Sequence, residues 1–178
     1  MLTIILLVLA VVIVVFVIVA TLQPAGFRIV RSATITAPPA VVFAQVNDLH
    51  AFQLWSPWAK LDPAMKSTFA GPPAGRDAVY AWVGNAKVGE GRMTITESKP
   101  ADRVQMKLEF LKPFKATNTT EFVFRAEGSM TAVTWSMSGT NGFMFKAVSL
   151  FMNMDKMVGK DFENGLANLK SVAEAAAK

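Results

Sequence analysis

The chain has 178 residues, of which 52% are hydrophobic and only 17% charged, and it contains no cysteine. This composition excludes a disulfide scaffold and is sufficient for one domain with a sizeable core. The net charge of +5 is carried by scattered lysines and arginines, and no nucleic-acid motif is present, so we expect no nucleic-acid partner.

Residues 2–22 form an apolar run without a charged side chain. As a helix this run would measure roughly 31 Å, which matches the hydrocarbon core of a bilayer. A cleaved signal peptide is the alternative, but it would have a basic start, a shorter apolar core and small residues at the cleavage site. We therefore predict a transmembrane anchor over residues 1–24, followed by one soluble domain over residues 25–178.

The charges beside the apolar run predict its orientation. Arg28 and Arg31 follow the run closely, and no lysine or arginine precedes it. Because basic residues favour the cytoplasmic side, we expect a single-pass membrane protein whose soluble domain lies in the cytoplasm. A basic domain held there also has anionic headgroups within reach.

The soluble part begins with the alternating pattern of a strand over residues 27–36. A proline pair then introduces a short helix over residues 40–47, and a second short helix is expected over residues 49–54. Residues 55–75 are irregular and rich in proline, with a short strand expected over residues 65–69. Loops of this length in a compact domain are often functional.

Five further segments show alternation or enrichment in β-branched and aromatic residues, each bounded by turn residues. They cover residues 79–83, 91–97, 104–111, 117–125 and 131–139. The connections are too short for crossover helices, so we expect an antiparallel sheet. In the third segment apolar and polar residues alternate strictly, which predicts one apolar face and one face in water.

The C-terminal part of the chain differs from the strand region in composition and in the spacing of its apolar residues. Residues 142–154 are rich in phenylalanine and methionine, and apolar residues then recur every three or four positions from Val158 to Ala176. The second pattern predicts an amphipathic helix long enough to lie across a sheet. The order of one strand, two helices, six strands and a terminal helix predicts an α+β fold, with helices covering one face of a curved antiparallel sheet.

Local motifs support this interpretation. They are ITAPPAVVF over residues 35–43, VND over 46–48, WSPW over 55–58, GEG over 89–91 and FENGLANLK over 162–170. With the order of elements, they resemble the SRPBCC or START-like helix-grip superfamily, and within it the polyketide cyclase/dehydrase branch. The resemblance covers nearly everything after the apolar run. It implies a sheet that grips the terminal helix around an apolar cavity.

The predicted inward faces supply large apolar and aromatic side chains for such a cavity. The residues expected to line it are Trp55, Trp58, Tyr80, Trp82, Met93, Ile95, Met106, Leu108, Phe110, Phe122, Phe124, Trp135, Met137, Phe145 and Phe162. Ten methionines add flexible thioethers that suit an irregular apolar ligand. Any one of these residues could instead fill a dry core, and only the set argues for a pocket. We also expect residues 142–154 to act as a gate.

The sequence offers little for catalysis. His50 is the only histidine, and we interpret it as a surface residue. Glu90 and Arg92 alternate with apolar neighbours, so their side chains are expected on the outer face of the sheet. Asp48 is interpreted as a turn residue. No metal-ligand spacing is recognisable, so we expect no metal and no cofactor.

Three functions remain open from the sequence. The favoured one is a membrane-anchored, non-catalytic domain that binds a lipid or another hydrophobic small molecule. The first alternative is a cyclase or dehydratase in which Tyr80, Glu90 or Asp48 positions and protonates a polyketide-like substrate. The second is a stress-response or interaction domain with a vestigial cavity. Fold alone does not decide among them, because the superfamily includes carriers, hormone binders, cyclases and chaperone activators. The sequence makes no prediction of oligomeric state.

Overall fold

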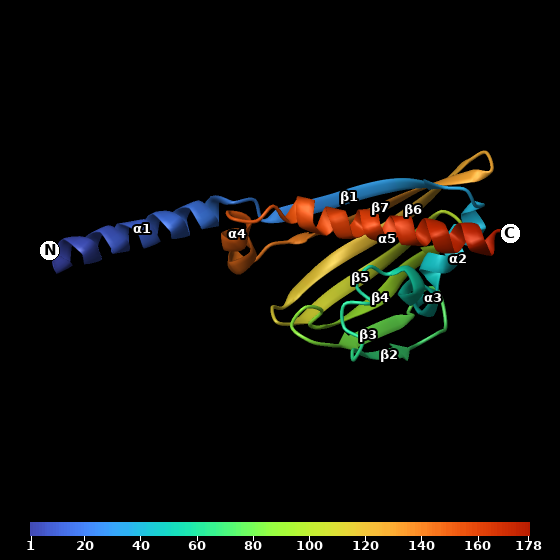
Figure 1. The fold of residues 1–178 in the computed structure, drawn as a ribbon, viewed down its shortest axis with the longest axis horizontal. Helices are drawn as coiled ribbons and strands as arrows, with labels where there is room; N and C mark the ends of the chain where they lie inside the picture. Colours follow the sequence, from blue (N-terminus) through green and yellow to red (C-terminus); the bar gives the residue numbers. More distant parts are fainter.

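The computed structural model describes residues 1–178 and contains five helices and one seven-stranded sheet (Figure 1). In chain order the elements are α1 (Leu2–Leu22), β1 (Gly26–Ile35), α2 (Pro39–Asn47), α3 (Leu49–Trp55), β2 (Lys66–Ala70), β3 (Val79–Val83), β4 (Glu90–Lys99), β5 (Arg103–Lys112), β6 (Ala116–Glu127), β7 (Met130–Thr140), α4 (Phe143–Ser149) and α5 (Met154–Ala176). The predicted α+β fold is confirmed. The sequence did not predict α4 as a separate helix.

The sheet is antiparallel throughout, with the strand order β1-β7-β6-β5-β4-β3-β2. Strands β2 to β7 follow one another as hairpins, whereas β1 returns to pair with β7. In that pair Gly26 lies opposite Thr140 and Ile35 lies opposite Thr131. The strand that follows α1 thus begins beside the end of the strand that precedes α4, so both helices leave the sheet at the same end (Figure 1).

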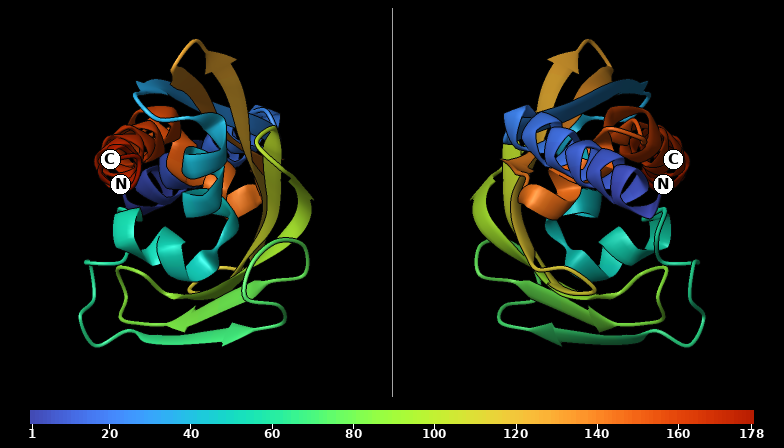
Figure 2. Two further views of the ribbon diagram at one scale, coloured as in Figure 1. Left: turned by 90° about the vertical axis from the view of Figure 1, so that its right-hand side faces the viewer. Right: turned by 90° about the vertical axis from the view of Figure 1, so that its left-hand side faces the viewer.

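The sheet curves around α2, α3 and α5, which lie on its concave face (Figure 2). The buried side of α5 includes Leu166, Leu169 and Ala173, which recur at helical spacing and pack into the core. Gly165 on the same side allows a close approach, because a Cβ atom there would lie 2.7 Å from the ring of Trp135. The terminal helix therefore packs closely on the sheet because Gly165 has no side chain and because its other buried residues are apolar.

Polar caps define where the short helix α3 and the long helix α5 begin. The Asp48 side chain accepts hydrogen bonds from the backbone nitrogens of His50, at 2.7 Å, and Ala51, at 3.4 Å, and so caps α3. The Asn153 side chain accepts one from the nitrogen of Lys156, at 2.9 Å, and caps α5. These caps satisfy backbone groups that the first turn of a helix leaves without a partner.

Helix α1 extends away from the sheet, and Ala20 is its one buried residue (Figure 1). By length and composition it could cross a membrane, and a signal sequence near the N-terminus would pass the same test. Its C-terminal turns contact α4 and the residues after it. The rings of Phe16 and Phe151 stack with centroids 6.1 Å apart, and the Lys146 ammonium donates to the Thr21 carbonyl oxygen at 3.2 Å.

Candidate ligand-binding site

A cavity of about 240 Å³ lies between the concave face of the sheet and the first half of α5. Twenty residues line it, fifteen of them hydrophobic, and it is partly open to solvent. Strands β3 to β7 each contribute inward-facing side chains, because alternate residues of a strand point to the same face. The cavity is therefore continuous with the core but is not filled by it.

Ten of the fifteen residues predicted from the sequence lie at this cavity. They are Trp58, Tyr80, Trp82, Met93, Leu108, Phe110, Phe122, Trp135, Met137 and Phe162. All of these except Trp58 and Phe162 belong to strands β3 to β7, where alternation marks the inward face. The alternation signal thus located most of the sheet side of the cavity.

The other five predicted residues lie elsewhere. Trp55, Ile95 and Met106 are fully buried in the core and do not reach the cavity surface. Phe124 packs edge-on against Phe43 of α2, and Phe145 belongs to α4 and contacts Phe114 in the β5–β6 turn. Alternation shows which face of a strand is inward, but it does not show where along the strand the interior changes from solid to hollow.

Sequence reasoning missed the lining that comes from α3, from irregular segments and from α5, together with Thr120 on β6. These residues are Phe52, Gln53, Ser56, Ala59, Met65, Lys87, Val88, Thr120, Val158 and Asp161. The available signal is the long proline-rich stretch over residues 55–75, in which the sequence points to a function but assigns only Trp55 and Trp58 to the cavity. Irregular backbone has no periodicity from which an inward face can be deduced.

One wall of the cavity is an aromatic stack centred on Trp135. Its ring lies parallel to Phe162, with centroids 3.9 Å apart, and is stacked on Phe122 at 4.8 Å. The indole nitrogen donates to the Thr120 hydroxyl oxygen at 2.9 Å, and that hydroxyl donates to the Ser136 carbonyl oxygen at 3.0 Å. Because its one polar atom has a partner, the Trp135 side chain is fixed in orientation as well as in position.

The opposite wall consists of Tyr80, Trp82 and Phe110. Trp82 stacks on Tyr80 with centroids 5.6 Å apart and meets Phe110 edge-on at 6.2 Å. Gly91 on β4 lies directly across from both Trp82 and Phe110 in the strand register. A Cβ atom on Gly91 would lie 2.5 Å from the Trp82 ring, so this glycine makes room for the wall.

A few polar groups interrupt the apolar lining. The Tyr80 hydroxyl lies 3.4 Å from the Ser67 hydroxyl. The amide nitrogen of Gln53 is buried and has no hydrogen-bond partner in the protein. Lys87 is the one lining residue that is exposed. Gln53 therefore carries unused hydrogen-bonding capacity beside an otherwise apolar space.

Of the three residues considered for catalysis, only Tyr80 lines the cavity. Asp48 caps α3, and Glu90 pairs with Lys112 at 2.7 Å, outside the cavity lining. His50 is exposed and stacks on Phe69 with ring centroids 3.7 Å apart, away from the cavity lining. No group of three or more histidine, aspartate or glutamate side chains could hold a metal ion.

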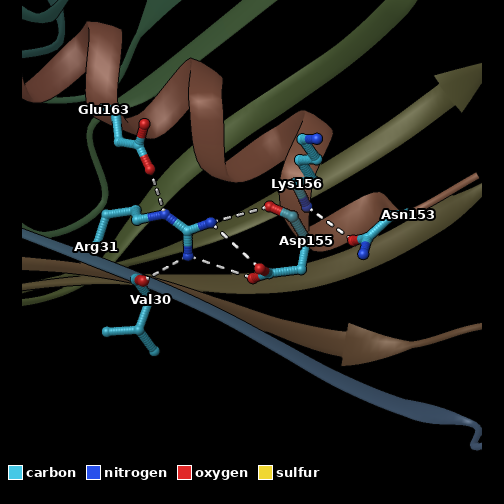
Figure 3. A network of polar contacts seen from close by, with 6 residues as sticks. All are labelled: Val30, Arg31, Asn153, Asp155, Lys156 and Glu163. Carbon is cyan, nitrogen blue, oxygen red and sulfur yellow. Dashed lines mark hydrogen bonds and ion pairs between the residues drawn. The ribbon is translucent and has the colours of Figure 1, made fainter.

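Arg31 on β1 fixes the first half of α5, which forms one side of the cavity (Figure 3). Its guanidinium donates to Glu163 at 2.8 Å and to the Asp155 carboxylate at 3.2 Å. The hydrogen bonds to Asp155 and then to Glu163 raise the pKa of Arg31 above its ordinary value. Gly159 lies between the two acidic residues, and a Cβ atom there would collide with the guanidinium. The glycine thus lets Arg31 lie across the helix.

Lys87, the one exposed residue of the lining, marks the mouth of the cavity and lies in the β3–β4 turn, at the end of the sheet from which α1 leaves. Lys87 and Val88 belong to the β3–β4 turn, while Val158 and Asp161 lie in the first half of α5. In an antiparallel sheet this turn and the β5–β6 turn share one end, and Gly89 lies against the backbone of Lys112. That end also holds the start of β1 and the end of β7 (Figure 1).

The chain belongs to the family described as polyketide cyclase/dehydrase and lipid transport, whose model matches residues 26–174. This confirms the resemblance seen in the sequence. No curated protein is detectably similar to the chain in sequence. The fold, the family and the apolar cavity together define a hydrophobic ligand-binding domain.

Solved structures with the same fold cover most of the chain at low identity. Protein TTHA0849 from Thermus thermophilus has a TM-score of 0.60 and 19% identity, covering 85% of this chain and all of that one. Protein CV1439 from Chromobacterium violaceum has a TM-score of 0.59 and 14% identity, covering 85% and 99%. Ara h 8.0201 has a TM-score of 0.55 and 12% identity, covering 85% and 97%. At these identities the likeness establishes the fold alone.

Proposed function

We propose that this protein is a membrane-anchored, non-catalytic domain that binds a lipid or another hydrophobic small molecule in its cavity. Residues 1–24 serve as the anchor and residues 25–178 as the binding domain. The observation that carries the proposal is the apolar cavity of about 240 Å³, fifteen of whose twenty lining residues are hydrophobic. Burial of apolar ligand surface, at about 25 cal/mol per Å², supplies the driving force.

The size of the cavity limits what it can enclose. A volume of about 240 Å³ corresponds to roughly eight water molecules at their share of liquid volume. It lies just below the range of about 300–1,000 Å³ usual for ligand pockets. The ligand is therefore a small apolar molecule, or a longer one of which a single portion enters while the remainder passes through the mouth.

Gln53 supports a ligand that carries at least one oxygen atom. Its amide nitrogen is buried without a protein partner, and such groups carry a cost that a ligand acceptor would remove. Replacing Gln53 with leucine should weaken binding of a ligand that has a carbonyl or hydroxyl group and leave binding of a pure hydrocarbon unchanged. Equal effects on both ligands would contradict this role.

The anchor is supported by the length of α1 and by its place beside the cavity mouth. A helix of 21 residues, all apolar except Thr3 and Thr21, is long enough to span the hydrocarbon core. Arg28 and Arg31 after the helix favour a domain on the cytoplasmic side. Tethering would keep the mouth near the bilayer, where hydrophobic ligands are concentrated. An intact N-terminus in protein recovered from the membrane fraction would separate the anchor from a cleaved signal.

The main test is native mass spectrometry of the full-length protein extracted in detergent, followed by analysis of the molecules it releases. We expect a co-purifying hydrophobic ligand. Leu108→Trp, which fills the cavity from β5, should lose that ligand while circular dichroism shows an intact fold. Leu54→Trp on the exposed side of α3 is the matched control and should retain it. If both variants retain the ligand equally, the ligand binds outside the cavity.

A second candidate function rests on Tyr80, whose hydroxyl is the one acid–base group among the residues considered for catalysis that reaches the cavity. In a cyclase or dehydratase it would donate a proton to a carbonyl oxygen of the substrate. Tyr80→Phe should then abolish turnover of a polyketide-like substrate without loss of binding. If this variant binds and releases the ligand unchanged and no product forms with the wild type, the carrier function stands.

A further inference from the structure

The end of the domain beside α1 exposes several large apolar side chains. Five of them are Phe114 in the β5–β6 turn, Phe143 and Met144 on α4, and Phe151 and Met152 just after it, and we refer to these five as the apolar end patch. Phe151 is 79% exposed and Met144 is 55% exposed. Helix α4 has no buried residue at all. Apolar side chains gathered in this way mark an interaction surface.

We propose that the apolar end patch is an interfacial membrane-binding surface, which lies at the boundary between the headgroups and the acyl chains beside α1. This inference rests on the proposed anchoring of the protein through α1. The partner is a lipid bilayer rather than a second protein. The contacts between α4 and α1, described above, set the depth of the patch.

The depth follows from the stacking of Phe151 on Phe16. Phe16 lies six residues before the end of α1, which corresponds to about 9 Å along the helix axis. If α1 spans the bilayer, Phe151 reaches the level of the outer hydrocarbon. Interfacial helices bury their apolar faces to depths of about 5–10 Å, so Phe151 lies where such side chains are found.

The polar groups around the patch have the arrangement that an interfacial position requires. Lys146 on α4 turns to the Thr21 carbonyl oxygen at the end of α1, which keeps its ammonium at the polar level. Lys115 in the β5–β6 turn and Arg28 near the start of β1 are exposed at the same end. Asp155, the first acidic residue after the patch in the chain, is paired with Arg31, and Glu90 at the same end is paired with Lys112. Asp161 beside the cavity makes no ion pair, but the unpaired charges next to the patch, on Lys115 and Arg28, are basic and complement anionic headgroups.

The β5–β6 turn is joined to α4, so the patch is one surface. The rings of Phe114 and Phe145 meet edge-on with centroids 6.3 Å apart. The patch lies at the same end of the sheet as the lining residues Lys87 and Val88, and α5, which carries the lining residue Val158, begins two residues after Met152. Docking of the patch would place the mouth against the bilayer, and a ligand could enter without crossing water.

Site-directed spin labelling tests the depth directly, because the chain has no cysteine and each variant therefore carries a single label. The full-length protein is reconstituted in vesicles of phosphatidylcholine with a minority of phosphatidylglycerol. Met144→Cys and Met152→Cys probe the patch. Val14→Cys marks the middle of α1, and Ser129→Cys in the β6–β7 turn marks the far, aqueous end. Accessibility to oxygen and to a water-soluble nickel chelate gives the depth.

We expect the labels at Met144 and Met152 to show oxygen accessibility approaching that at Val14 and nickel accessibility well below that at Ser129. If the labels at Met144 and Met152 are as accessible to nickel as a label in water while the Val14 label is buried in the bilayer, the inference is wrong but the proposed anchor still holds. A water-exposed Val14 label would overturn both. Labels shielded from both reagents would mean that a second copy covers the patch, which also overturns the inference.

Ligand uptake provides a second readout that does not depend on the labels. The double variant Phe143→Ser with Phe151→Ser should take up a fluorescent fatty acid from vesicles several-fold more slowly, while its affinity for the same probe in detergent is unchanged. The matched control is Leu54→Ser on α3, because the exposure of Leu54 lies between the exposures of Phe143 and Phe151. Equal uptake rates for the double variant and the control would contradict the proposed role of the patch.

Discussion

The two halves of α5 rest on different parts of the sheet, one solid and one hollow. The second half buries Leu166, Leu169 and Ala173 in a core where Trp55 is fully enclosed. The first half covers the cavity and is held both by Phe162, whose ring stacks on Trp135, and by Arg31, whose guanidinium reaches two carboxylates. Because these contacts at single points add to the packing of the second half, the fold can keep an unfilled space without losing the position of its wall.

The largest expected effect contrasts the same substitution in the two regions. Leu169→Ala in the solid region should lower the free energy of unfolding by about 2–5 kcal/mol, because the cavity it leaves cannot collapse. Leu108→Ala at the existing cavity should cost clearly less and should admit a larger ligand. Denaturant unfolding followed by tryptophan fluorescence, together with ligand titration, measures both. Equal losses of stability would mean that the Leu108 region is as well packed as the core.

The next effect concerns the room that Gly91 leaves for the aromatic wall. Gly91→Ala should lower the free energy of unfolding by about 1–3 kcal/mol, the usual cost of overpacking, and should weaken ligand binding by displacing Trp82. Gly26→Ala is the control, since this glycine also lies in a strand but has open space around its Cβ position. If both variants bind ligand normally, the Trp82 wall is not part of the binding site.

A smaller effect is expected for Arg31, because its carboxylate partners are largely exposed to solvent. Arg31→Met should loosen the first half of α5 and speed amide hydrogen exchange in its first three turns, together with ligand release. Lys170→Met is the control, since Lys170 donates to the Thr34 carbonyl oxygen further along the same helix and strand. Unchanged exchange near residue 158 would show that packing alone holds the helix there.

The smallest expected effect is the pH dependence of stability at Glu109, on the face of β5 that carries charges. Arg92, at 2.6 Å, and then Lys107, at 2.8 Å, lower the pKa of Glu109 from 4.5 to about 2. Because the folded-state pKa is the lower one, this carboxylate stabilises the fold above pH 4.5, and the contribution is lost as the pH falls towards 2. In Glu109→Gln the melting temperature should depend less on pH between 4.5 and 2 than it does in the wild type. If the melting temperature of this variant falls with pH as steeply as that of the wild type, other groups cause the acid sensitivity.

Much of the fold was predictable because its signals are local. Alternation along residues 104–111 identified the inward face of β5, and the recurrence of apolar residues from Val158 onward identified α5. Helix α4 escaped prediction because seven residues, almost all apolar, show no contrast between two faces. The lining from Gln53 and Met65 escaped for a similar reason, since a short helix and irregular backbone give no clear periodic pattern.

The sequence by itself determined the order of the elements, the inward faces of the strands and an apolar segment long enough to cross a membrane. These depend on backbone periodicity and side-chain polarity, which act over a few neighbouring residues. Only the tertiary structure decided that Trp55 fills the core whereas Trp58 lines a cavity. It also decided that the mouth lies at the end of the sheet from which α1 leaves. Both depend on contacts between residues far apart in the chain, such as the pairing of β1 with β7 and the hydrogen bond of Arg31 to Glu163.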